Sequence, residues 1–267
     1  MEIDSLAYRT DLTLAKAEGE VADRGDYLVV TTPSNPGFHW GNYLLFKRGP
    51  QDGDLARWEA IFDREIGCRL KVEHYAFGWD QTGPEPGCVG QVLAKKYNLN
   101  RSVVLTAREA HLPPKYNDEA VVRALRTDSE WGQALENQIA CNDEDHEPRS
   151  FRAFKTRQME AYRRMAACGQ GWWFGAFIGD RLVADLGIFV TGRTARFQNV
   201  ETCREHRREG ICGTMVYESS RRAAELAGID EFVMVADEDY HAARIYESVG
   251  FLPREHQYGL DWWKRGA

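Results

Sequence analysis

The sequence lacks the features that mark membrane-spanning, secreted and zinc-binding proteins. No apolar run reaches the roughly 18 residues of a transmembrane helix, and the opening MEIDSLAYRTD has neither the basic nor the apolar region of a secretory signal. The 6 cysteines are scattered without a CxxC pair, and HExxH is absent. We therefore expect a cytoplasmic protein with free thiols, no bound metal and no membrane partner.

A surplus of basic residues is also missing. The 267-residue chain has 34 Lys and Arg against 41 Asp and Glu, which gives a net charge of −7. A general nucleic-acid-binding surface is therefore not expected. The hydrophobic content of 43% is that of a globular protein, and the length allows one large or two ordinary domains.

Two common nucleotide-binding motifs, GxxxxGK[ST] and GxGxxG, are absent as well. The sequence has instead a local basic cluster, EHRREGICGTMV (205–216), just before a predicted long helix. The first amides of a helix have no partner within it, and the helix dipole adds a partial positive charge there. Arg207 and Arg208 add charge, and Gly210 has no Cβ to keep a ligand away. This combination suits an anion, most plausibly a phosphate.

The polar segment 109–119, with two adjacent prolines, suggests a division into residues 1–117 and 118–267. The second region predicts the order β-α-α-β-β-β-α-β-α-β. The first predicts strands at 26–33, 40–46, 71–79 and 102–107 and helices at 54–67 and 88–99. A strand-helix-strand-helix-strand order recurs in both regions, but their sequences scarcely match, so an old duplication stays open.

Two motifs of the second region resemble those of the GNAT superfamily of acyl-CoA-dependent N-acyltransferases. The run RREGIC (207–212) is similar to the superfamily's pyrophosphate motif, with Cys212 in place of Gly or Ala. The segment DYHAARIYESVGF (239–251) is similar to its second motif, with Asp239 in place of Asn and with Ala242 and Tyr246 matching. The resemblance covers the chain from residue 121 onward.

The resemblance implies an α/β (α+β) GNAT fold, in which a mixed, mostly antiparallel sheet is flanked by helices. It leaves open whether the first region is a degenerate copy. It also implies acetyl-CoA as the acyl donor, held by a bulged strand at 197–202 and by the amides that follow Arg207. An amide near Val200 would polarise the thioester carbonyl. The residues expected to bind acetyl-CoA are Val200, Thr202, Arg207, Arg208, Glu209, Gly210, Ile211, Cys212, Gly213, Thr214, Asp239 and Ala242.

Two residues are candidates for proton transfer. Tyr246 is the expected general acid for the departing thiolate. A phenol of pKa about 10 gives up a proton to a thiolate of pKa about 8.5 only at a cost of roughly 2 kcal/mol, so a hydrogen bond to the sulfur is the alternative. Glu201 is a candidate base for the attacking amine. Each residue also has a purely structural interpretation. Tyr246 would then be a packed aromatic side chain on a helix, and Glu201 a carboxylate at the end of a strand.

These expectations favour an N-acyltransferase that moves an acetyl group from acetyl-CoA to a primary amine of a small molecule, by direct attack in a ternary complex. A non-catalytic acyl-CoA-binding or sensor protein and a protein or peptide N-acetyltransferase remain alternatives. The sequence does not identify the acceptor, which would be set by Trp131, the loop 141–148, Trp172–Trp173 and the first region, and it leaves the oligomeric state unknown.

Overall fold

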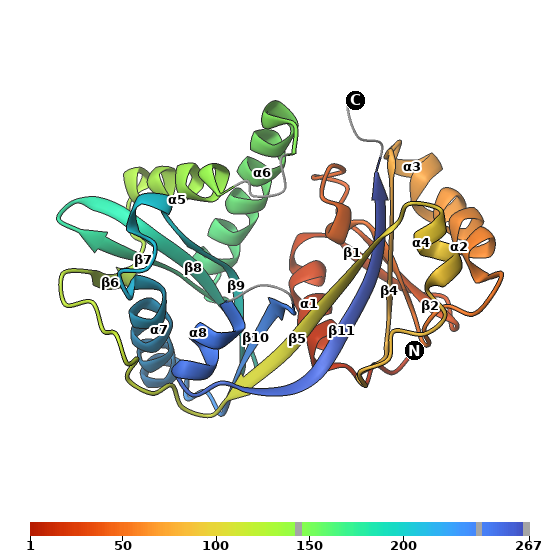
Figure 1. Ribbon diagram of the computed structural model, residues 1–267. Helices are drawn as coiled ribbons and strands as arrows, with labels where there is room; N and C mark the ends of the chain where they lie inside the picture. The colour runs from red at the N-terminus through yellow and green to blue at the C-terminus, as the bar shows by residue number, and fades with distance from the viewer. Residues whose placement is uncertain (142–145, 239–241, 264–267) are drawn as a thin grey trace. The chain divides into compact units, whose positions relative to one another are not determined.

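The computed structural model describes residues 1–141, 146–238 and 242–263 (Figure 1). The chain packs into two compact units. The N-terminal unit comprises Met1–Val104, Asp237–Asp239 and Glu255–Ala267, and the C-terminal unit comprises Leu105–Ala236 and Tyr240–Arg254. Each unit is thus built from discontinuous segments, because most of the last strand packs with the first part of the chain. The division at residue 117 stays a prediction about sequence domains.

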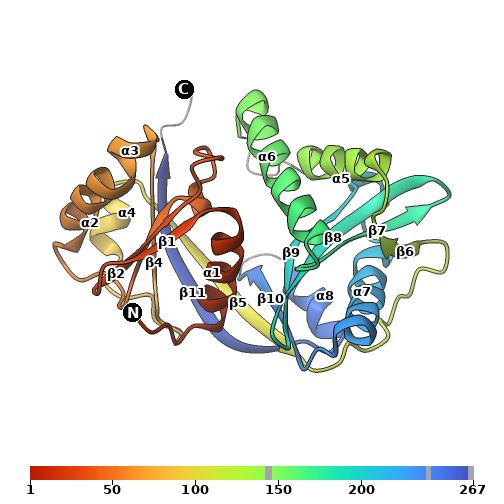
Figure 2. The same cartoon turned by 180° about the vertical axis from the view of Figure 1, so that it is seen from behind.

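Most of the predicted final strand packs with the first part of the chain, but up to that strand the C-terminal unit has the predicted element order. Its strands lie in the order β6-β7-β8-β9-β10, antiparallel from β6 to β9 and parallel between β9 and β10. Helices α5 and α6 cover one face of this sheet, and α7 and α8 the other (Figures 1 and 2). The elements are β6 (Val121–Ala124), α5 (Asp128–Ala140), α6 (Pro148–Ala167), β7 (Gly171–Ile178), β8 (Arg181–Thr191), β9 (Thr194–Thr202), α7 (Ile211–Ala227), β10 (Glu231–Asp237) and α8 (Ala242–Ser248).

Local sequence signals explain where these elements begin and turn. Thr127 caps α5 in a capping box with Glu130. Glu147 caps α6, and Pro148 occupies the first turn of that helix. Gly179, at φ 60°, makes the turn between β7 and β8.

The N-terminal unit has its strands in the order β1-β2-β3-β4-β11. Pairing is antiparallel in each step except the parallel pair β3–β4. The elements are α1 (Leu6–Glu18), β1 (Glu20–Asp23), β2 (Tyr27–Thr31), β3 (Tyr43–Phe46), α2 (Asp54–Phe62), a π-turn (Asp63–Gly67), α3 (Cys68–Leu70), β4 (His74–Trp79), α4 (Gly90–Ala94), β5 (Asn98–Ala107), of which residues 98–104 lie in this unit, and β11 (Leu252–Trp263), to which it contributes residues 255–263.

Alternating side chains of β2, β3 and β4 give the N-terminal unit two cores, one on each face of its sheet. Leu28 and Leu45 pack on α1, whereas Val29, Leu44 and Phe46 pack on α2. The sequence did not predict α1 or β1. The helix predicted at 88–99 is wrong in length: α4 ends at Ala94 because Lys96 takes a left-handed backbone with φ 64°, and the chain then enters β5.

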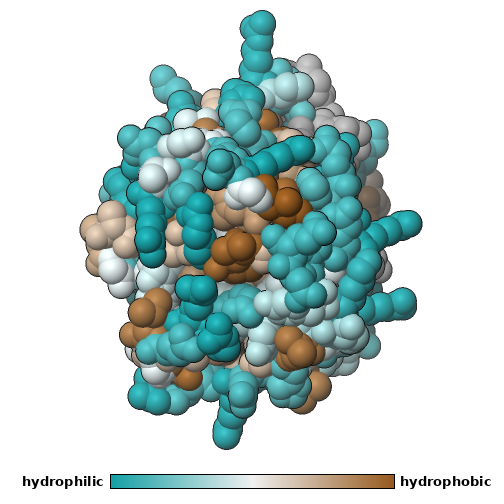
Figure 3. Space-filling view, turned by 90° about the vertical axis from the view of Figure 1, so that its left-hand side faces the viewer, coloured by the Kyte–Doolittle hydropathy of each residue, from teal (hydrophilic) through white to brown (hydrophobic). Residues whose placement is uncertain are grey.

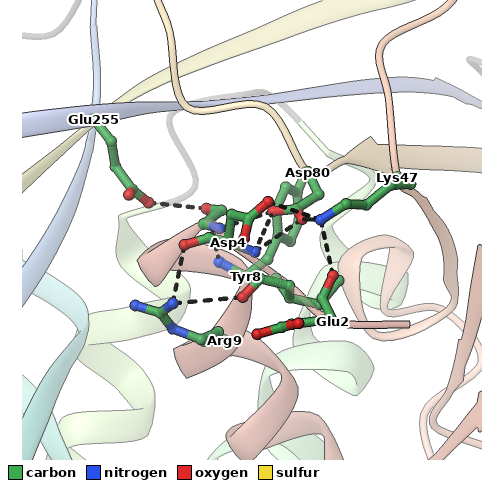
Figure 4. A network of polar contacts seen from close by, with 9 residues as sticks. Glu2, Asp4, Tyr8, Arg9, Lys47, Asp80 and Glu255 are labelled. Carbon is green, nitrogen blue, oxygen red and sulfur yellow. Dashed lines mark hydrogen bonds and ion pairs between the residues drawn. The ribbon is translucent and has the colours of Figure 1, made fainter.

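The N-terminal segment is tied to the strand ends by a polar network (Figure 4). The buried carboxylate of Asp80, just after β4, accepts hydrogen bonds from the backbone N–H of Asp4 and of Ser5. It also pairs with Lys47, which follows β3, at 2.8 Å. Glu255 of β11 accepts from the Ser5 hydroxyl at 2.9 Å. The start of α1 is thereby fixed to three strands.

Both units share a layout. Two antiparallel steps are followed by a parallel one in β1–β4 and again in β7–β10, with α2 or α7 crossing between the parallel strands. Each crossing helix follows a glycine with a left-handed backbone, Gly53 at φ 87° and Gly210 at φ 84°. The first loop is acidic, however, and Asp54 accepts from the N–H of Gln51 at 2.9 Å. This supports a degenerate copy of the same fold whose first loop lacks the basic residues of the second.

The outer surface of the C-terminal unit is largely polar. Figure 3 looks onto this unit and shows hydrophilic side chains over most of the visible face, with apolar side chains in small groups near its middle. The mean hydropathy of the chain, −0.53, is in keeping with this. Isolated apolar groups of this kind are normal on a surface in contact with water.

Candidate functional site

Strand β9 carries a bulge near its end. Asp185 of β8 lies opposite Glu201, and Gly187 lies opposite Gln198, so that Asn199 and Val200 together face a single residue of β8. Asn199 has the left-handed backbone, φ 47°, that such an extra residue often takes. The bulge predicted for 197–202 is confirmed.

Beyond the bulge, β9 separates from its parallel neighbour. The ladder between β9 and β10 joins Thr194, Ala195 and Arg196 to Glu231, Phe232 and Val233 and goes no further within the described chain. The side chains of 195–197 are buried, whereas those of 198–202 are half-buried. The last residues of β9, Val200 and Thr202 among them, therefore have an edge that β10 does not cover.

The loop after β9 presents backbone donors at the start of α7. Two left-handed residues, Arg208 at φ 65° and Gly210 at φ 84°, turn the chain into the helix. The first helical bond runs from the N–H of Thr214 to Gly210 at 3.0 Å. Within the described chain, the N–H groups of residues 211–213 (Ile211, Cys212 and Gly213) have no hydrogen-bond partner. Such a row of donors at a helix start fits a phosphate.

The polar segment that suggested a domain boundary in fact braces this loop. Lys115 donates to the carbonyl of Arg208. Asn117 donates its backbone N–H to Thr214 Oγ1 at 2.8 Å and its side-chain amide to the carbonyl of Glu209 at 3.1 Å. A Cβ on Gly210 would overlap the carbonyl oxygen of Lys115. The glycine is therefore required by packing as well as by its backbone angle, which sequence reasoning missed.

The two arginines of the loop have different surroundings. Arg207 is half-buried, and its Nε donates to the carbonyl of Thr202 at 3.3 Å, which joins the loop to the end of β9. Arg208 is exposed. Glu209 is exposed and pairs with His206 at 3.1 Å. Both arginines thus belong to the loop just before the free amides, one anchored to the end of β9 and the other exposed.

Glu201 lies near two half-buried thiols, Cys141 and Cys212. Burial, together with the charge of Glu201, raises the pKa of Cys141 to about 12, while Arg207 acts in the opposite direction. The same two causes raise the pKa of Cys212 to about 12. Both thiols stay protonated at neutral pH, so neither is an activated nucleophile.

A buried polar network next to Glu201 was not predicted. Asp185 is 0% exposed, and its carboxylate accepts from Asn137 at 2.6 Å, Gln138 at 2.8 Å and Trp173 at 2.9 Å. Burial raises the pKa of Asp185 to about 7, the charge of Glu201 acts in the same direction, and the three donors oppose it. The only sequence signal was a pair of amide side chains in the last turn of α5, an unusual choice for a buried helix face.

The second motif is described in part. Tyr246 lies on α8 and is 5% exposed, and its carbonyl accepts from the N–H groups of Val249 and Phe251 at 3.1 Å where the helix ends. Asp239 lies outside the described residues, and α8 begins at Ala242. The catalytic role of Tyr246 and the binding roles of Asp239 and Ala242 stay predictions.

A cavity of about 290 Å³ lies against three of the residues expected to shape the acceptor site, Trp131, Trp172 and Trp173. Arg126 and Arg163 line it as well. Two guanidinium groups disfavour a cationic amine there, so this cavity does not explain how an ammonium acceptor would be held.

Two general searches of the described residues found nothing. None of their helices combines the length and the apolarity needed to cross a bilayer. Nor do three or more His, Cys, Asp or Glu side chains come together among them in a group able to hold a metal ion.

A family model described as FR47-like protein matches residues 177–260, the range that contains the bulge, the loop at 207–214 and Tyr246. The chain is similar in structure to a functionally unknown conserved protein from Staphylococcus epidermidis ATCC 12228, with 12% identity, 91% of this chain and 93% of that chain covered, and a TM-score of 0.71. A GCN5-related N-acetyltransferase from Kribbella flavida has 13% identity, 99% and 97% coverage and a TM-score of 0.65.

A tandem GNAT protein from the clavulanic acid biosynthesis pathway has 11% identity, 82% and 73% coverage and a TM-score of 0.53. Comparison with curated proteins found no match. At such low identities the structural likeness speaks for the fold. The chain therefore has the GNAT fold, and the resemblance of its second half to the GNAT superfamily is confirmed.

Proposed function

We propose that the C-terminal unit transfers an acetyl group from acetyl-CoA to a primary amine of a small molecule, by direct attack in a ternary complex. One observation carries the proposal: the free amides of 211–213 open the helix that follows a bulged strand, and β10 does not cover the end of that strand. A ligand with a diphosphate and an extended amide-bearing arm matches these two features together.

The donor set suits the phosphates of such a ligand. Backbone N–H groups at a helix start bind anions, and the flanking guanidinium groups of Arg207 and Arg208 add charge-assisted bonds. The carboxylate of Glu209 pairs with His206 and would repel a phosphate. Glu209 would therefore bind the ligand through its backbone N–H. The uncovered backbone of Val200 and Thr202 would pair with the arm as a further strand would.

The chain's own groups supply the remaining chemistry. The N–H of Val200 would polarise the thioester carbonyl, a contribution that can lower a barrier by about 3 kcal/mol. Glu201, half-buried at the end of β9, would take a proton from the incoming ammonium directly or through water. Tyr246 would donate a hydrogen bond or a proton to the departing sulfur.

Calorimetric titration with acetyl-CoA tests the donor, and a panel of polyamines, amino sugars, amino acids and basic peptides tests the acceptor. Release of CoA is best followed by liquid chromatography, because the 6 free cysteines of the chain would react with a thiol reagent. Binding with transfer to a small amine supports the proposal. Binding without transfer would favour the acyl-CoA sensor, and transfer confined to peptides would favour the protein N-acetyltransferase.

Tyr246→Phe tests the acid separately. Phenylalanine keeps the packing, so acetyl-CoA affinity should hold while kcat falls about a hundredfold, the lower end of the effect of a general acid. Tyr217→Phe, a change of the same kind on α7, is the matched control. An unchanged kcat in Tyr246→Phe would remove this residue from the mechanism.

A further inference from the structure

The hydrogen-bond partners of the buried Asp185 carboxylate are all of one kind, although the Glu201 carboxylate lies opposite it on β9. Oδ1 accepts from Gln138 Nε2 and Trp173 Nε1, and Oδ2 accepts from Asn137 Nδ2. All three partners are N–H donors, and Asp185 is 0% exposed. An ionised carboxylate can only accept, so this environment holds it as an acceptor and fixes which end of each amide faces it.

The fixed end of Gln138 reaches the bulge. Its Nε2 donates one hydrogen to Asp185 and the other to the carbonyl of Asn199, at 2.8 and 2.9 Å. Its Oε1 accepts from Lys155 at 3.4 Å. Gln138 is 1% exposed, so no water competes for these bonds. Were the amide reversed, Oε1 would face two acceptors, a carboxylate and a carbonyl, which is strongly unfavourable.

The carbonyl of Asn199 and the N–H of Val200 belong to the same peptide group. This group is trans, since the described chain has no cis peptide bond, and peptide groups are planar. The N–H of Val200 must therefore point away from the carbonyl that Gln138 holds. The side chain of Asn199 adds a second anchor by donating to Gln158 at 3.0 Å.

We infer that Asp185 is a positioning residue for acyl transfer: through Gln138 it sets the orientation of the Asn199–Val200 peptide, and so aims the Val200 N–H at the thioester carbonyl of the bound donor. This inference rests on the proposed function. The inference goes beyond the proposed function because it names a carboxylate of β8 as the group that sets the peptide orientation in the bulge of β9.

A purely structural role would not need this residue. A buried carboxylate is costly to desolvate, and apolar residues of similar size often stabilise a core as well or better. An apolar residue, however, could not select one orientation of the Gln138 amide, because it forms no hydrogen bond with it. Two changes follow from this. In Asp185→Asn, the new NH2 group can turn Gln138 around and release the carbonyl of Asn199. In Gln138→Met, a chain of similar length has no hydrogen bond to offer.

The test compares Asp185→Asn, Gln138→Met and the double variant with the wild type, with Asp230→Asn as the matched control. Asp230 is an exposed carboxylate of the same unit that pairs with Arg193. Acetyl-CoA labelled with ¹³C at the carbonyl is the probe, because a hydrogen bond to that oxygen lowers its infrared stretching frequency. Binding of the probe is measured by calorimetry, and kcat is measured with the best amine of the panel.

We expect each single variant to bind acetyl-CoA within about threefold of wild type and to lose about tenfold to hundredfold in kcat, as a misplaced catalytic group does. The carbonyl band should return toward its position in free acetyl-CoA. The double variant should be no worse than either single one, because both act through one chain of contacts. Asp230→Asn should match the wild type. If one variant fails to fold, the other carries the comparison.

A wild-type carbonyl band and kcat in Asp185→Asn would overturn this inference while leaving the proposed function intact. Losses that multiply in the double variant would overturn it as well, since the two residues would then act separately. A wild-type protein that neither binds acetyl-CoA nor releases CoA would overturn the proposed function and this inference with it.

Discussion

Replacing Gly210 by alanine probes the loop proposed to bind phosphate, and Gly53 provides a matched control. Each glycine precedes a helix with nearly the same backbone, φ 84° and ψ −2° at Gly210 and φ 87° and ψ −10° at Gly53. Alanine in this left-handed conformation costs about 1–2 kcal/mol at either position. Only at Gly210 would the new Cβ also overlap a neighbour, Lys115, whereas it would meet nothing within 4 Å at Gly53.

The overlap at Gly210 cannot be relieved by a change of rotamer, because the nearest atom is the backbone oxygen of Lys115. Either the loop at 208–210 or the bracing segment at 113–117 must move. Inserting a methyl group into a packed site costs about 1–3 kcal/mol. Gly210→Ala should therefore lose about 2–5 kcal/mol of unfolding free energy, and Gly53→Ala about 1–2 kcal/mol.

Differential scanning calorimetry measures the difference, since each kcal/mol lowers the Tm of a unit of this size by about 2–4 °C. The same movement would displace the free amides of 211–213, so titration with acetyl-CoA should show weaker binding in Gly210→Ala and unchanged binding in Gly53→Ala. Equal losses of stability in the two variants, with equal affinities, would refute the reasoning that Lys115 sets the loop.

Three further predictions concern charge and burial. Replacing Arg207 and Arg208 together by alanine should weaken acetyl-CoA binding at least about tenfold, because charge-assisted bonds to phosphate are lost; titration calorimetry measures this, and an unchanged affinity would contradict the phosphate assignment. Burial lowers the pKa of His74 from 6.5 to about 4, so the unfolded chain takes up the proton first as the pH falls. The unfolding free energy from urea titrations should be highest above pH 6.5 and fall by about 3 kcal/mol by pH 4. This dependence on pH should be weaker in His74→Gln. If the variant shows the same dependence as the wild type, His74 is not its source. Asp80→Ala should cost about 2–4 kcal/mol, because the N–H of Ser5 and of its neighbour are left without their acceptor. Hydrogen exchange of the α1 amides should quicken, and unchanged protection would argue against this anchor.

Elements with strong local signals were predictable. The order of strands and helices in the C-terminal unit follows from caps such as Thr127, from the glycine turn at Gly179 and from apolar periodicity. Weak local signals failed. Helix α1 was missed because its apolar residues form a core only by packing on β2 and β3. Helix α4 was predicted too long because nothing in the local sequence indicates the left-handed turn at Lys96.

The site divides in a similar way. The basic run at 207–212 and the glycine that starts α7 could be read from residue types and spacing, and the bulge at Asn199 from the family resemblance. The partners of these residues could not. Lys115 and Asn117 lie about a hundred positions before the loop they brace, and Asp185 meets Gln138 only because α5 packs across β8.

The sequence by itself determined what depends on neighbours along the chain: where most helices start and stop, and which strands follow one another. It also showed that two arginines and a glycine lie between a strand and the long helix after it. Tertiary structure alone decided what depends on register and packing. It assigned residues 255–263 of the last strand to the N-terminal unit, made the segment expected at a domain boundary a support for the loop before α7, and buried Asp185 next to the bulge. The physical reason is that hydrogen-bond partners and burial are set by contacts between segments far apart in the chain. Local sequence patterns do not show which of these segments will meet.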